Sequence, residues 1–302
     1  MLSSIAALLL LLGIAPLLPG IASRTRSLLT GRRGPPVLQL YADLWKLARR
    51  GAVYSTATTA VFRFAPITVA ATAVAAAMLL PLDGVAGVLR FSGDALAFAY
   101  VLGLGRFLLV LGALDTGSSL EGMGASREVA FASVVEMGLF FAIATLSVVT
   151  HELSLSGMFG ASLGDRWTHA APSLVMVALG LFGLLLAECA RVPVDDPSTH
   201  LELTMVHEVM VLDHSGPDLG LLLYAGAVKL AVFSALVVAV LVPRSSASLP
   251  ESLAILVTGV LVISVAVGVV ESVTARLRLP TVPLYVAGAA ALSGFGLILV
   301  VR

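Results

Sequence analysis

Apolar runs of about 20 residues recur along the whole chain, and no other feature constrains the fold as much. A helix of that length crosses the roughly 30 Å of hydrocarbon in a bilayer. Only helices and closed barrels satisfy every backbone hydrogen bond in lipid, and the alternation typical of strands is absent. The sequence therefore predicts an all-α integral membrane protein with a single membrane domain over 1–302. The expected spans are about 2–22, 61–82, 93–113, 128–150, 171–190, 220–242, 252–272 and 282–301.

Composition excludes several classes of protein. Charged residues make up 12% of the chain, against about 25% in soluble domains, which excludes a soluble enzyme. The 18 basic and 18 acidic residues leave no net charge, so nucleic acid is not an expected partner. The only cysteine, Cys189, excludes a disulfide framework and an iron–sulfur cluster held by this chain alone.

The distribution of Lys and Arg predicts the orientation. Connections after the odd-numbered spans carry twelve of these residues, and the other connections with the C-terminus carry four. Because basic loops stay in the cytoplasm, we expect the odd-numbered loops there and both termini outside. The two long connections, 23–60 and 191–219, fall on the same side. This placement suggests a docking surface for a soluble partner in a multi-pass protein of the plasma (inner) membrane.

The first long connection contains an amphipathic stretch. Apolar side chains recur at helical spacing, and Gln39, Asp43, Lys46 and Arg50 occupy the other face. The apolar positions are Val37, Leu38, Tyr41, Leu44, Trp45 and Ala48. The stretch is either an interfacial helix in the headgroup layer or a helix whose polar face carries a partner subunit, and the two interpretations are compatible.

Five ionisable residues lie inside the expected spans, all in the cytoplasmic half. They are Arg106, Glu136, Glu188, Lys229 and Glu271. Buried charge is costly, so such residues indicate function by default. Two interpretations remain open, namely static pairs of Glu136 or Glu188 with Arg106 or Lys229, and a hydrated chain of groups that conducts protons. Four acids, Asp83, Asp94, Glu152 and Asp165, lie at or beyond the outer helix ends, where we expect water to reach them.

The connection 188–219 combines acids with three histidines seven residues apart. On one helix His200, His207 and His214 would share a face, but seven residues span about 10 Å, too far to share one metal ion. The string beginning at His207-Glu208 has Val211 in its fifth position, so the zinc-protease pattern fails. No metal site is therefore expected, and the loop is either an ordinary solvated segment or a set of groups that pass protons.

Several motifs together resemble a known family. The string GRRGPPVLQ at 31–39, with DLWKL at 43–47, is similar to the first cytoplasmic loop of a membrane-arm anchor subunit. That subunit is shared by respiratory complex I and the complex-I-like (group 4) nickel–iron hydrogenases. Ala187-Glu188, Arg191, Pro193, Asp195, Pro197 and Glu202-Leu203 resemble the loop between spans 5 and 6 in both branches, and Asp213-His214-Ser215-Gly216 resembles the loop's end.

Two features favour the hydrogenase branch, which includes formate hydrogenlyase and hydrogenase-4. Asp115-Thr-Gly and Gly124-Ala-Ser-Arg127-Glu128 look like that branch, and His200 stands where the complex I pattern has the first of two glutamates. Quinone binding is expected only under the alternative, in which the chain is the quinone-site subunit 1 of complex I. A stand-alone secondary transporter is the alternative of another class, although the two halves show no convincing repeat.

The resemblance implies a subunit without a redox centre of its own that is not itself catalytic. It would anchor the hydrogenase large and small subunits on the cytoplasmic side, contact antiporter-like subunits in the bilayer, and link their chemistry to ion movement. The nickel–iron centre and the iron–sulfur clusters would belong to partners. Expected docking residues are Arg33, Asp43 and Lys46. Expected pathway residues are Glu128, Glu136, Glu188, Arg191, Asp195, Glu202 and Asp213, with Arg106 and Lys229 added on physical grounds.

Overall fold

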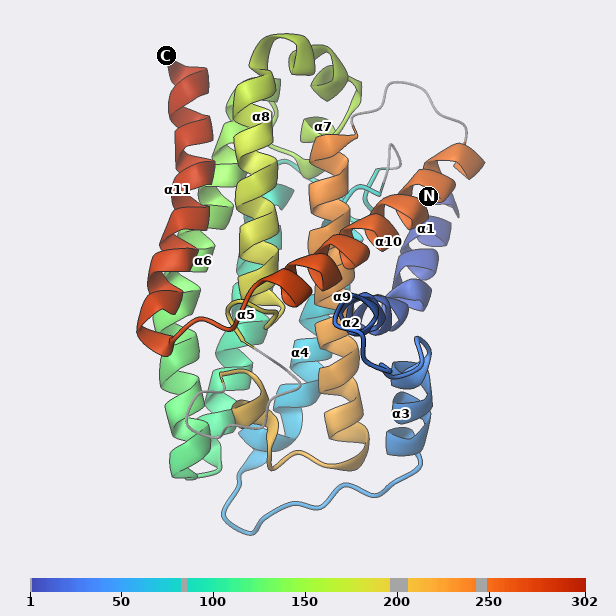
Figure 1. Cartoon of the computed structure of the whole chain (residues 1–302), viewed down its shortest axis with the longest axis vertical. Coiled ribbons are helices and arrows are strands. Elements are labelled where there is room, and N and C mark those ends of the chain that lie inside the picture. The colour runs from blue at the N-terminus through green and yellow to red at the C-terminus, as the bar shows by residue number, and fades with distance from the viewer. Residues whose placement is uncertain (1, 83–85, 196–205, 243–248) are drawn as a thin grey trace.

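The computed structural model describes residues 2–82, 86–195, 206–242 and 249–302 as a bundle of helices (Figure 1). The helices in chain order are α1 (Leu2–Ile14), α2 (Leu17–Leu29), α3 (Gln39–Ala48), α4 (Ala60–Leu79), α5 (Asp94–Asp115), α6 (Ser119–Thr150), α7 (Leu155–Met158), α8 (Ala161–Glu188), η1 (Glu208–Val211), α9 (Gly216–Leu241), α10 (Leu249–Val273), η2 (Leu279–Thr281) and α11 (Val282–Val301).

The spans agree with the expected number of eight. Within the described ranges, seven helices are long and apolar enough to cross a membrane, and the bent pair α1–α2 makes an eighth. The multi-pass membrane fold is thereby confirmed. Two helices extend beyond the expected spans, because α6 begins at Ser119 and α8 at Ala161, before the expected 128 and 171. Hydropathy marks only the apolar part of a helix, and both helices continue into polar sequence.

The first span is broken, whereas the sequence pattern predicted one helix over 2–22. α1 and α2 meet at a bend of 43°. Pro16 has no N–H to donate to the carbonyl oxygen of Leu12, one turn earlier. The hydroxyl of Tyr224 in α9 donates to that oxygen at 3.2 Å, and the hydroxyl of Tyr41 in α3 donates to the oxygen of Gly13. Two side chains thus replace the backbone donors that the break removes.

α9 is the central helix of the bundle (Figure 1). Its apolar window is 72% buried, against 28% for the last span, because α4, α8 and α10 all pack on it. α6, α8 and α11 pack together at one side, and α10 crosses the bundle obliquely beside α2. This arrangement brings α5, α6, α8 and α9 together around the same part of the interior.

α3 is helical as expected, and much of its apolar stripe is exposed. Leu47 lies near Gly220 of α9, whereas Leu38, Tyr41 and Trp45 are exposed. The guanidinium of Arg49 stacks on the Trp45 ring at 4.2 Å. The exposed stripe is compatible with both lipid and a partner subunit.

Asp94 departs from the expectation of a water-exposed acid. Its side chain is buried, and its carboxylate accepts hydrogen bonds from the Leu155 N–H at 2.6 Å and the Ser154 hydroxyl at 2.9 Å. The acid therefore ties the segment after α6 to the start of α5, which is a structural role.

Candidate functional site

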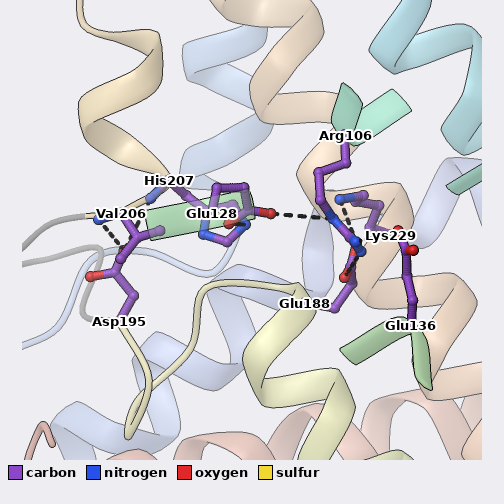
Figure 2. A network of polar contacts seen from close by, with 8 residues as sticks. All are labelled: Arg106, Glu128, Glu136, Glu188, Asp195, Val206, His207 and Lys229. Carbon is purple, nitrogen blue, oxygen red and sulfur yellow. Dashed lines mark hydrogen bonds and ion pairs between the residues drawn. The ribbon is translucent and has the colours of Figure 1, made fainter. Parts of the chain in front are cut away.

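Arg106 of α5 is the centre of a buried polar network (Figure 2). Its guanidinium contacts three carboxylates: Glu128 at 3.3 Å, Glu136 at 2.8 Å, and Glu188, to which it donates a short hydrogen bond. The two α6 acids, Glu128 and Glu136, are eight residues apart and so lie on one helix face. Gly103 makes room for one of them, since a Cβ there would lie 3.1 Å from the Glu136 Oε1.

Lys229 of α9 extends the network through Glu188. Its ammonium lies 2.8 Å from the Glu188 Oε1, so this 2% exposed carboxylate faces two cations. The expected pairs of Glu136 and Glu188 with Arg106, and of Glu188 with Lys229, are therefore present. The pairing is shared, because one guanidinium serves three acids. When all are ionised, three carboxylates face two cations and one negative charge remains in excess.

His207 also belongs to the network, and the sequence analysis did not single it out as a site residue. Its Nε2 lies 3.4 Å from the Glu128 Oε2. The backbone N–H groups of Val206 and His207 donate to the Asp195 carboxylate at 3.1 and 3.3 Å (Figure 2). Arg276 pairs with the same acid at 2.8 Å. His207 precedes the short η1, which ends before His214, so these two histidines do not share a helix face.

Two cavities border these groups. The larger has a volume of about 350 Å³, and its apolar wall comes mainly from α9, with single residues of α2, α3, α4, α5 and η1. Its polar wall consists of Glu188, Arg191, Asp195, His207, Glu208 and Lys229. The smaller, of about 10 Å³, lies between Glu128, Glu188 and His207, and such a volume holds about one water molecule. The network therefore lies beside space that water can enter.

Arg191 and Cys189 both line the larger cavity. Arg191 pairs with Glu271 of α10 at 3.4 Å, so this expected pathway residue contacts an acid outside the Arg106 network. Burial raises the pKa of the Cys189 thiol to about 12, which keeps it protonated and unreactive at neutral pH.

Other expected site residues lie apart from the network. Asp213 is exposed, and its backbone N–H donates to Glu121 at 3.0 Å. Lys46 pairs with Asp43 at 3.6 Å on α3, and Arg33 is exposed in the loop before it. Glu202 and His200 fall outside the described residues. Within the described ranges no group of three His, Cys, Asp or Glu side chains is arranged to hold a metal ion.

Comparison with known proteins identifies the family. The profile of the NADH dehydrogenase family matches residues 2–301. The chain belongs to this family. Two Escherichia coli (strain K12) relatives are hydrogenase-4 component C, 31% identical over 91% of this chain and 88% of the relative, and formate hydrogenlyase subunit 4, 30% identical over 91% and 90%.

A solved structure shares the fold of this NADH dehydrogenase family member. A chain of the membrane-bound sulfane sulfur reductase, an archaeal respiratory membrane complex, superposes with a TM-score of 0.82 over 99% of this chain and 98% of that one, at 18% identity. The resemblance to the complex I subunit 1 family is confirmed. The relatives are subunits of multi-subunit membrane complexes, and this chain is accordingly a membrane subunit.

Proposed function

We propose that the chain is the membrane anchor and coupling subunit of a complex-I-like nickel–iron hydrogenase or formate hydrogenlyase. The observation that carries the coupling role is the shared network of Arg106, Glu188 and Lys229 beside a cavity. If these ion pairs only held helices together, each cation could pair with one acid. Here Glu188 faces two cations and Arg106 faces three acids, so a change of protonation at one group is felt electrostatically by all the others.

Glu136 is the member of this network that reaches the outer surface of the helix bundle. Its side chain is 41% exposed although it lies within a spanning helix, while Arg106, Glu128 and Glu188 are buried. Leu104, Phe107 and Met137 on the same two helices are also exposed. A carboxylate facing lipid is costly, which favours a second membrane subunit over this face. We propose that an antiporter-like subunit covers it and exchanges charge with Glu136.

The loops on the side of α3 supply the proposed docking surface for the hydrogenase large and small subunits. Arg33, Asp43 and Lys46 belong to this surface, and the nickel–iron centre and iron–sulfur clusters would be held by those partners. The odd-numbered loops would then be cytoplasmic and both termini outside. Affinity purification through a C-terminal tag, followed by nickel and iron analysis of the co-purified proteins, tests the partners.

The larger cavity favours the second candidate, the quinone-site subunit of a complex I. Its apolar wall, including Leu222, Leu223 and Leu230, fits an isoprenoid tail, and the ammonium of Lys229 and the imidazole of His207 are donors for a quinone carbonyl. Labelling of the purified complex with a photoreactive quinone, competed by native quinone, distinguishes the candidates. Competed labelling of α9 or of Arg191 would favour this second function.

Neutralising Glu188 tests the coupling. In the assembled complex in liposomes, we expect Glu188→Gln to lower the protons moved per hydrogen produced by about tenfold or more, since positioned acid–base groups contribute about 10²- to 10⁴-fold. Glu136→Gln should act in the same direction. Asp165→Asn is the matched control, because Asp165 is exposed at the start of α8. Native proton-to-hydrogen ratios in both glutamine variants would overturn the coupling role.

A further inference from the structure

His207 lies between the two cavities. Among the described residues, only His207 and Glu188 line both the 350 Å³ cavity and the 10 Å³ cavity. Glu188 is committed to Arg106 and Lys229. The His207 side chain is 23% exposed and contacts Glu128 alone among the described ion-pair partners. The imidazole therefore stands between the cavity and the carboxylates.

The surrounding structure holds His207 by its backbone. Asp195 accepts from the His207 N–H, and Arg276 holds Asp195 from the segment after α10. The same segment donates the Leu277 N–H to the Pro193 oxygen at 3.0 Å, which joins it to the turn that carries Asp195. These contacts fix the main chain at His207 and thereby place its ring beside Glu128.

The neighbours of His207 define its chemistry. Glu128 of α6 faces its Nε2, Glu188 of α8 and Lys229 of α9 line the same cavity, and Glu208 follows in η1. Carboxylates, ammonium and guanidinium ordinarily keep their charge at neutral pH. Imidazole gains and loses a proton there. His207 is thus the member of the described set with the chemistry of a proton carrier.

We infer that His207 passes protons from the larger cavity to Glu128. A proton from cavity water binds the neutral ring, giving imidazolium, and the Nε2 proton then moves to the Glu128 Oε2. The step leaves neutral imidazole and a carboxylic acid, so charge and atoms balance. Protonation of Glu128 removes one of the three negative charges around Arg106, which frees the guanidinium to favour Glu136 and Glu188. This role rests on the proposed coupling function and names the entry point of its pathway.

The test compares His207→Gln and His207→Gly in the assembled complex in liposomes. Both variants lack the imidazole ring, so we expect the protons moved per hydrogen produced to fall by about tenfold or more. His207→Gly leaves space next to the cavity, so added imidazole should restore the ratio there and leave His207→Gln unchanged. His169→Gln is the control, since His169 is an exposed histidine near the start of α8.

The outcomes separate this inference from the coupling function. If Glu188→Gln uncouples the complex while both His207 variants behave as the native protein, the role of His207 is overturned and the coupling function stands. If the His207 variants are uncoupled and imidazole restores neither, His207 is a structural residue and the inference is again overturned. If Glu188→Gln and the His207 variants all couple normally, the coupling function itself has failed. If added imidazole restores the ratio in His207→Gly and not in His207→Gln, the proton transfer is supported.

Discussion

Arg106 is a single cation that three carboxylates share, which is more than a stabilising ion pair requires. Removing two ions from water costs several kcal/mol for each, and their attraction repays this only with good geometry. A one-to-one buried pair would serve stability equally well or better. Arg106 instead meets three acids from two helices. The excess carboxylate makes the occupancy of each contact depend on protonation of the others.

Single residues inside apolar runs were predictable, and residues in polar loops were not. Arg106, Glu136, Glu188 and Lys229 stand out because ionisable side chains are rare within apolar sequence, and the structure brings these four together. His207 and Arg276 lie in polar connections, where charge is ordinary. Their contacts with Glu128 and Asp195 depend on tertiary structure, which no local pattern in the sequence records.

His214 makes a residue-scale prediction about pH. Its ring stacks on Phe62, with centroids 3.9 Å apart, and burial lowers its pKa while Asp218 and Asp213 act in the opposite direction. The unfolded state therefore binds the proton more readily, so stability is complete above the ordinary value of 6.5 and declines as the pH falls below it. Phenylalanine keeps the stack without titrating. We expect His214→Phe to reduce the drop in Tm between about pH 8 and pH 5.

The control for that measurement is His169→Phe, at an exposed histidine. It should leave the dependence of Tm on pH as in the native chain. An unchanged slope in His214→Phe would contradict the assignment of the buried imidazole as a source of acid sensitivity.

At the scale of elements, the bend between α1 and α2 is a feature that hydropathy does not predict. Pro16 lies in an apolar run, and the run alone reads as one helix. Whether a proline bends a helix depends on donors elsewhere that can satisfy the freed carbonyl oxygens. Those donors are Tyr41 and Tyr224, which come from α3 and α9. The break could be predicted from the sequence only by knowing which helices pack beside it.

Tyr224 and Pro16 should be energetically coupled. Tyr224→Phe removes the donor to the partly buried Leu12 oxygen, at a cost of about 1 kcal/mol in the free energy of unfolding. Pro16→Ala restores a backbone N–H that can bond to the same oxygen. We therefore expect Tyr224→Phe to cost much less in the Pro16→Ala background, measured by unfolding in detergent.

Tyr100→Phe serves as the control for this cycle, because Tyr100 is exposed on α5. Its effect should be small and the same in both backgrounds. Equal costs of Tyr224→Phe with and without Pro16 would show that the hydroxyl does not compensate the break.

For the whole molecule, the number of spans and the all-α class followed from the length of the apolar runs alone. The proposed orientation rests on the distribution of Lys and Arg. It can be tested in a Cys189→Ala background, which lacks the native cysteine. A cysteine at Ser55, in the exposed connection before α4, should react with a membrane-impermeant thiol reagent only in inverted vesicles. A cysteine at Asp165 should react in intact spheroplasts. The reverse pattern would place the proposed docking loops outside the cell.

The most direct test of the account is a density map of the assembled complex sharp enough to show ordered water. The account predicts solvent from the larger cavity through His207 and Glu128 to Arg106, with Glu136 covered by a neighbouring membrane subunit. Dry, one-to-one contacts among these side chains, with Glu136 facing lipid, would contradict it.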